Sequence, residues 1–192
     1  MILETVTDAS SVEALRRAFH EAAPPHVTVP EAITENDAAA LRRRVAPDLQ
    51  PFYVPDRGRY HLNRTFVDAP LFDALLALAQ KVVAAPLSVG AARWLRFMHG
   101  DYQLMRGDVV DRPERARHIE ATLDFSAAAT EQAELAFVGE RAKFTVPQVP
   151  RSLTLVERDE SVLSFDYYLN NHVGAAEVWR LRLALPYKSA PV

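Results

Sequence analysis

Two histidines and one aspartate have the residue types and spacing of a metal site. His99 and Asp101 are separated by one glycine in RWLRFMHGDYQL, and His172 comes much later in the chain. Residues i and i+2 of an extended strand point to the same face, so His99 and Asp101 are expected to reach one ion together. Two imidazoles and a carboxylate hold iron(II) with three adjacent positions open. The sequence therefore predicts a metal centre at His99, Asp101 and His172.

Two arginines lie in the last apolar stretch, VWRLRLALPY. Arg180 and Arg182 are two residues apart, so both fall on the same face of a strand. A guanidinium among core leucines is costly unless it has an anionic partner. A carboxylate supplies that partner with two parallel hydrogen bonds. We therefore expect Arg182, or Arg180 in its place, to hold the carboxylate of a bound acid.

A second pair with the same spacing, His118 and Glu120, lies in HIEATLDFS. A single His-x-acid pair is weak as a motif, so the two pairs must be weighed against each other. Gly100 lets the backbone approach or bend at a metal, which favours His99 and Asp101. For His118 and Glu120 we expect a surface ion pair at the start of a strand.

The first half of the chain, residues 1–90, has the start and stop signals of helices. Polar residues precede runs with apolar side chains at helical spacing, and prolines follow them. The segment 48–67 carries prolines and aromatic residues without helical spacing, and is expected to be loop with one or two short extended pieces. The helices expected are, each with its cap, 12–23 (Ser10 or Ser11), 35–46 (Thr34) and 70–85 (Asp68).

The second half, residues 91–187, consists of short runs rich in β-branched and aromatic residues, separated by polar turns. No helix between them is long enough for a crossover between parallel strands, so the strands are expected to be antiparallel. The fold class predicted is mainly β with N-terminal helices, in which residues 1–192 form one domain and about three helices buttress a β core. The extended runs are 93–105, 118–126, 133–138, 142–149, 152–157, 161–169 and 178–187.

Composition excludes several classes of protein. The chain has 192 residues, a net charge of −3 and no cysteine, so neither a disulfide framework nor a thiolate site is expected. No run approaches the roughly 18 to 20 apolar residues of a membrane span, and the N-terminus lacks the pattern of a signal peptide. The arginines are interspersed with acids, which argues against nucleic acid. We expect a cytoplasmic protein without nucleic-acid or membrane partners.

The order of these features resembles that of the iron(II)- and 2-oxoglutarate-dependent oxygenases. His99-x-Asp101 comes first, then an antiparallel β core, then His172, and Arg182 ten residues after it. The prolyl-hydroxylase-like and small-molecule hydroxylase branches are the most similar in layout, over roughly residues 90 to 187. The resemblance implies a double-stranded β-helix, or jelly roll, with iron on the two histidines and Asp101. It also implies 2-oxoglutarate on Arg182 and O2 as the oxidant.

The chain departs from the pattern of that family at two places. Many relatives carry an Arg-x-Ser pair on the last strand, whereas here Ala184 follows Arg182. The second histidine also comes later than usual after the preceding turn, so Arg180 is the alternative contact for the co-substrate. A halogenating branch lacks the metal carboxylate, whereas Asp101 is present here, so hydroxylation or desaturation is expected.

The leading hypothesis is therefore a dioxygenase that oxidises a C–H bond of a small molecule or an amino-acid-like substrate. Two alternatives stay open. One is a cupin-like metal-binding protein without 2-oxoglutarate chemistry, with His118 and Glu120 as possible ligands. The other is a non-catalytic β-sandwich that binds a partner. The oligomeric state cannot be deduced from the sequence.

Overall fold

The computed structural model describes residues 8–55, 58–103, 117–130, 133–139, 143–159, 162–166 and 176–188. Its helices lie in the first half of the chain, as predicted, together with three strands, and the remaining strands follow. The helices are α2 (Ala9–Glu21), α3 (Glu35–Val45), the 3-10 turn η1 (Ala46–Asp48) and α4 (Ala69–Val83). The strands are β1 (His26–Val29), β2 (Gln50–Val54), β3 (Gly58–Asn63), β4 (Ala92–Phe97), β5 (Tyr102–Gln103), β6 (His118–Asp124), β7 (Leu135–Val138), β8 (Lys143–Val146), β9 (Leu153–Arg158), β10 (Leu163–Asp166) and β11 (Val178–Pro186).

Each of the three α-helices begins at an oxygen side chain that accepts hydrogen bonds from the first turn. The predicted caps of α3 and α4 are confirmed: Thr34 accepts from the Asp37 N–H, and Asp68 accepts from the Leu71 N–H. The predicted cap of α2 is wrong. The carboxylate of Asp8 accepts from the N–H groups of Ser10 and Ser11, so the helix begins before them.

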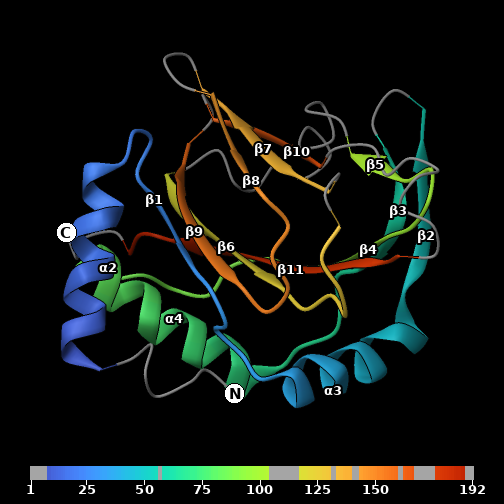
Figure 1. The fold of residues 1–192 in the computed structure, drawn as a ribbon, viewed down its shortest axis with the longest axis horizontal. Coiled ribbons are helices and arrows are strands. Elements are labelled where there is room, and N and C mark those ends of the chain that lie inside the picture. Colours follow the sequence, from blue (N-terminus) through green and yellow to red (C-terminus); the bar gives the residue numbers. More distant parts are fainter. Residues whose placement is uncertain are drawn as a thin grey trace.

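All strand pairs are antiparallel, as expected, and they form one curled sheet. The strand order is β1-β9-β6-β11-β4-β3-β5-β10-β7-β8, with β2 paired to β3. Figure 1 shows β7, β8 and β10 above the layer made by β9, β6, β11 and β4, so the sheet folds over on itself as a jelly roll. The fold class predicted from the sequence is confirmed, and segment 48–67 holds the hairpin β2–β3.

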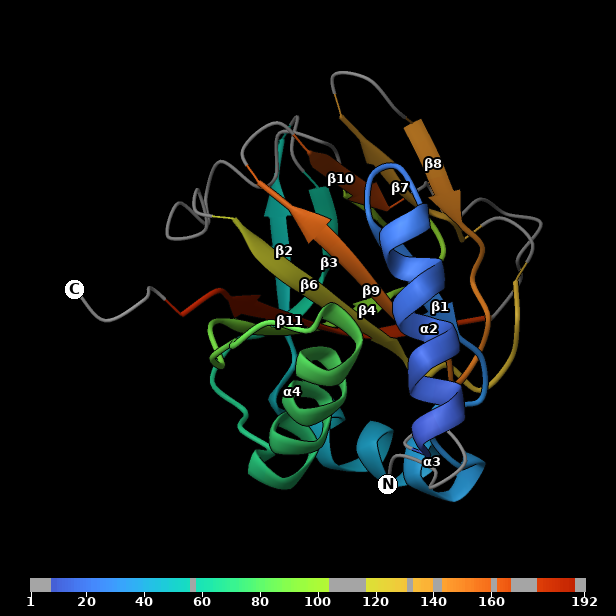
Figure 2. The same ribbon diagram turned by 90° about the vertical axis from the view of Figure 1, so that its left-hand side faces the viewer.

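The helices cover one face of the larger layer. Figures 1 and 2 show α3 and α4 on the side of β6, β9 and β11 that lies away from β7 and β8, and α2 beside β1 and α4. The apolar core fills the space between these helices and the sheet. It is built from buried side chains such as Leu71, Leu75, Leu78, Trp94, Leu123, Leu155, Leu181 and Leu183. Among the described residues, none of the helices combines the length and the apolarity needed to cross a bilayer.

Candidate functional site

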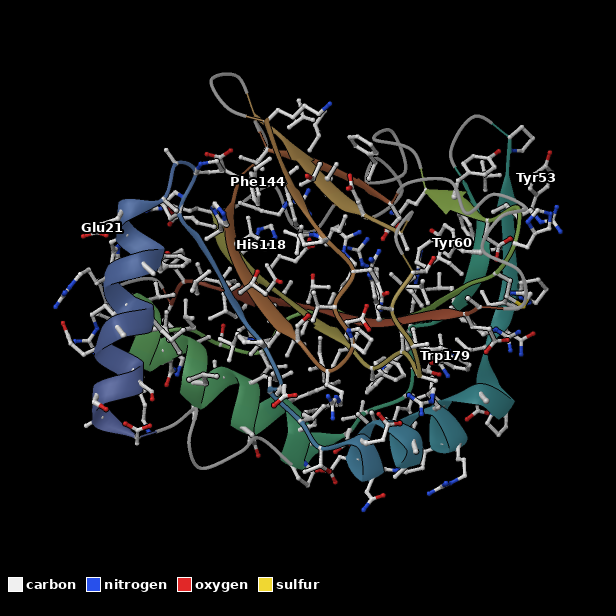
Figure 3. All side chains as sticks on the ribbon, viewed as in Figure 1. Glu21, Tyr53, Tyr60, His118, Phe144 and Trp179 are labelled. Atoms are coloured by element: carbon white, nitrogen blue, oxygen red, sulfur yellow. The ribbon has the colours of Figure 1, made fainter. Side chains whose placement is uncertain are left out.

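The inner face of the sheet is polar, although it is buried. Successive residues of a strand alternate between faces, and on β6 and β11 the apolar ones point to the helices. The side chains on the other face therefore enter the space between the two layers, which we call the lumen. Figure 3 shows side chains of both layers meeting there, with His118 labelled among them and Tyr53 far out on β2. The buried polar residues of β6, β9 and β11 in the lumen are His118, Glu120, Thr122, Asp124, Thr154, Arg158, Arg180 and Arg182.

Glu120 lies at the centre of this polar lumen. Its Oε1 accepts hydrogen bonds from Nε and Nη2 of Arg182, at 2.8 and 2.6 Å, and its Oε2 accepts one from Nη1 of Arg158. The Nη2 atom of Arg93 lies 3.9 Å from Oε2. Burial alone would raise the pKa of Glu120, but the guanidiniums of Arg182, Arg158 and Arg93 outweigh it and hold that pKa well below its usual range. Glu120 is therefore an ionised carboxylate shared among three arginines.

Arg180 lies beside a second group of acids in the lumen. Its Nη1 donates to Asp166, its Nη2 donates to the Ala133 carbonyl at 2.8 Å, and its Nε lies 3.8 Å from Asp124. Burial lowers the pKa of Arg180 to about 10 and raises that of Asp124. Both oxygens of Asp124 also accept from Gln148, each at 3.1 Å. Both arginines predicted to bind a co-substrate are thus buried and paired with carboxylates of the chain.

His99 and Asp101 lie in a turn, so the extended geometry assumed for them is wrong. Strand β4 ends at Phe97, and the Asp101 N–H donates to the Met98 carbonyl across the turn. Gly100 takes the left-handed conformation there, with φ of +83°. The imidazole of His99 is exposed, whereas Asp101 is 2% exposed. The turn therefore places the two predicted ligands in different surroundings.

The carboxylate of Asp101 is held by its own turn and by a neighbouring arginine. It accepts from the Met98 N–H at 2.9 Å and lies 3.4 Å from Nε of Arg59. Burial raises its pKa.

Arg182 pairs with Arg93 on the lumen face of the sheet. The structure thus brings Arg180 and Arg182 together in the lumen. His172 lies outside the described residues, so the three-ligand site stays a prediction.

The surroundings of Glu120 differ from those expected from the sequence. The expected surface ion pair with His118 is wrong, because the two side chains are 2% and 4% exposed. The signal was present in HIEATLDFS, where polar and apolar residues alternate strictly. Such alternation is typical of a strand with one solvent-exposed face. In this structure the polar face of the strand is buried and points into the lumen, toward its arginines.

The comparisons with known proteins bear on the fold. Sequence comparison matches no family model and no curated protein. Three solved structures are similar: a prolyl-4-hydroxylase from Pseudomonas putida, a prolyl hydroxylase from Trichoplax adhaerens in complex with a hypoxia inducible factor peptide, and HygX from Streptomyces hygroscopicus with nickel, 2-oxoglutarate and hygromycin B bound. Their TM-scores are 0.69, 0.70 and 0.58, at 13%, 8% and 11% identity. The matches cover 93%, 96% and 85% of this chain and 100%, 92% and 83% of the other chains.

The chain has the fold of the 2-oxoglutarate- and iron(II)-dependent oxygenases. The resemblance inferred from the sequence is thereby confirmed at the level of the fold. In this fold, the guanidinium of Arg182 holds the carboxylate of Glu120, so the carboxylate end of 2-oxoglutarate would have to take the place of Glu120 to bind there. For iron, no three His, Asp or Glu side chains of the described residues cluster closely enough to hold a metal ion.

Proposed function

We propose that the chain is an iron(II)- and 2-oxoglutarate-dependent oxygenase that oxidises a C–H bond of a small molecule. The observation that carries the proposal is Arg182, a fully buried guanidinium that binds a carboxylate inside a barrel of the oxygenase fold. When bound, iron(II) and 2-oxoglutarate supply the oxidation by O2. The protein would hold the co-substrate through Arg182, or through Arg180, and would exclude water from the lumen. His99, Asp101 and His172 are the proposed metal ligands.

The small-molecule substrate rests on one neighbour of the fold. HygX was crystallised with hygromycin B, whereas the Trichoplax adhaerens enzyme was crystallised with a peptide. Both substrate classes therefore belong in the test. Succinate formation is measured with a panel of free amino acids and aminoglycosides, and separately with proline-containing peptides.

The decisive experiment is an anaerobic titration of the purified chain with iron(II) and then with 2-oxoglutarate. Chelation of 2-oxoglutarate to bound iron gives a weak visible charge-transfer band, which we expect to appear and to saturate. The band should weaken in Arg182→Met and disappear in His172→Ala, with Glu13→Gln on the surface of α2 as the control variant. A folded wild-type protein that gives no band at millimolar 2-oxoglutarate refutes the oxygenase. Metal binding without the band favours the cupin-like alternative.

One observation favours a second function, a non-catalytic module of the same fold. Arg180 and Arg182 are both paired with carboxylates of the chain, and such pairing is also what a purely structural buried network requires. The module predicts no affinity for iron(II), and it predicts that Asp101→Ala changes only the free energy of unfolding. An Asp101→Ala variant that keeps wild-type stability but loses iron binding excludes it.

A further inference from the structure

The carboxylate position on Arg182 is occupied by the chain itself. The Nε and Nη2 atoms of Arg182 form the edge with which a guanidinium usually meets a carboxylate, and both donate to Oε1 of Glu120. The rest of the guanidinium is also surrounded, by Ser164, by Oε1 of Gln103 at 3.4 Å and by Oδ2 of Asp166 at 3.7 Å. An external carboxylate therefore reaches this edge only by displacing Glu120.

Glu120 can release Arg182 without losing all its partners. Its two oxygens divide the arginines: Oε1 faces Arg182, while Oε2 faces Arg158 and Arg93. A carboxylate from outside would then pair with Arg182 while Glu120 keeps the two other guanidiniums. Neither carboxylate would be left buried without a cationic partner, so the exchange avoids the large free-energy cost of an unpaired buried charge.

Beside Arg180, the described part of the lumen leaves little space for a second carboxylate. The cavity next to Arg180, between Asp124, Gln148 and Thr154, has a volume of about 10 Å³. That is at the lower limit for one water molecule. A dicarboxylate must therefore take space as well as hydrogen bonds from the present side chains.

We propose that Glu120 is an internal competitor for the carboxylate of the co-substrate and sets the affinity of the chain for dicarboxylates. The inference rests on the proposed function, which supplies the ligand class, a dicarboxylate such as 2-oxoglutarate. Glu120 is linked covalently to the site, so its effective concentration there greatly exceeds that of a free acid. The wild-type chain should consequently bind dicarboxylates weakly, and loss of the Glu120 charge should strengthen binding at Arg182.

The test measures binding of glutarate and of 2-oxoglutarate to metal-free protein by calorimetry in the presence of EDTA. Glu120→Gln removes the charge and retains the shape, and Glu120→Asp retains the charge but withdraws it by one methylene. We expect both variants to bind each acid at least tenfold more tightly than wild type. Asp124→Asn is the matched control, because Asp124 is a buried carboxylate of the same lumen that contacts Arg180, Ser126 and Gln148. The double variant Glu120→Gln/Arg182→Met should lose the gain.

Three results overturn the inference. The first is equal affinity in the wild type and the Glu120 variants, and the second is an equal gain in Asp124→Asn. The third is failure of both Glu120 variants to fold, because Glu120 would then be indispensable to the barrel and not exchangeable. The readout needs no iron, so it is independent of the charge-transfer band. A tenfold gain without any band refutes the oxygenase alone, whereas a band without the gain refutes the competition alone.

Discussion

Replacing Glu120 by glutamine should destabilise the chain more than any surface charge change. The carboxylate accepts two hydrogen bonds from Arg182 and one from Arg158, all fully buried. Glutamine keeps one carbonyl acceptor and turns an N–H₂ group toward a guanidinium. Removing one partner of a buried ion pair costs about 3 to 5 kcal/mol, because the other charge stays behind unpaired. For a chain of this size, that loss corresponds to a fall in melting temperature of roughly 6 to 20 °C.

The assay is urea unfolding at pH 7 followed by tryptophan fluorescence. Trp94 and Trp179 are 0% and 4% exposed, so their fluorescence reports on the core. Glu13→Gln is the control variant. Glu13 pairs with Arg16 on the surface of α2, where the two side chains are 57% and 37% exposed, so its loss should cost less than about 0.5 kcal/mol. A Glu120→Gln protein whose unfolding free energy lies within about 1 kcal/mol of that of the control would show that the buried network contributes little.

The same pair of proteins gives a pH dependence of known sign. The folded state lowers the pKa of Glu120 below its ordinary value of 4.5, so the stability it contributes is present above that pH and is lost as the pH falls below it. Glu120→Gln lacks this contribution. The difference in unfolding free energy between the two proteins should therefore shrink below pH 4.5, by up to about 1.4 kcal/mol per pH unit. A difference that stays constant down to pH 3 contradicts the proposed ion pairing.

Three further predictions concern the framework around the lumen. Leu75→Ala, in the helix face of the core, should cost about 2 to 5 kcal/mol in urea unfolding, and a cost below 1 kcal/mol would contradict the packing of α4 on the sheet. Asp68→Ala should lower stability by about 1 kcal/mol through loss of the cap on the Leu71 N–H, and Asp68→Asn should restore most of it. Gly58→Ala would place a Cβ 2.9 Å from the Tyr102 carbonyl oxygen, so amide exchange should accelerate in β5, and unchanged exchange would refute that close approach.

The helices and most strands follow from local signals in the sequence, because caps and apolar periodicity act within one element. The positions of α3 and α4 follow in this way from Thr34 and Asp68. Strand β1 was missed for the opposite reason. It has four residues, and its partner β9 lies more than 120 residues later in the chain, with His26 opposite Val156. Pairing over that distance leaves no local mark in either segment.

The turn at Met98–Asp101 shows why the metal site was harder to predict than the strands. The stretch 93–105 has the composition of one continuous strand, and alternation along such a strand would place His99 and Asp101 together. Gly100, the residue whose freedom suggested a metal site, instead allows the left-handed turn that separates β4 from β5. One glycine is compatible with both outcomes, so the motif alone could not distinguish them.

The need of Arg182 for an anionic partner could be predicted from the sequence, whereas the identity of that partner depends on the strand order. A guanidinium at position 182 needed an anion, and the structure supplies one. Energetics alone cannot say whether that anion is a ligand or a side chain, because either satisfies the same donors. The choice is made by the strand order, which places β6 beside β11 with Arg182 opposite Thr122 and thus diagonal to Glu120. If Glu120 competes with the co-substrate as proposed, the affinity of this lumen for a dicarboxylate depends on the pairing between β6 and β11, and a change at Glu120 should alter it without a change at Arg182.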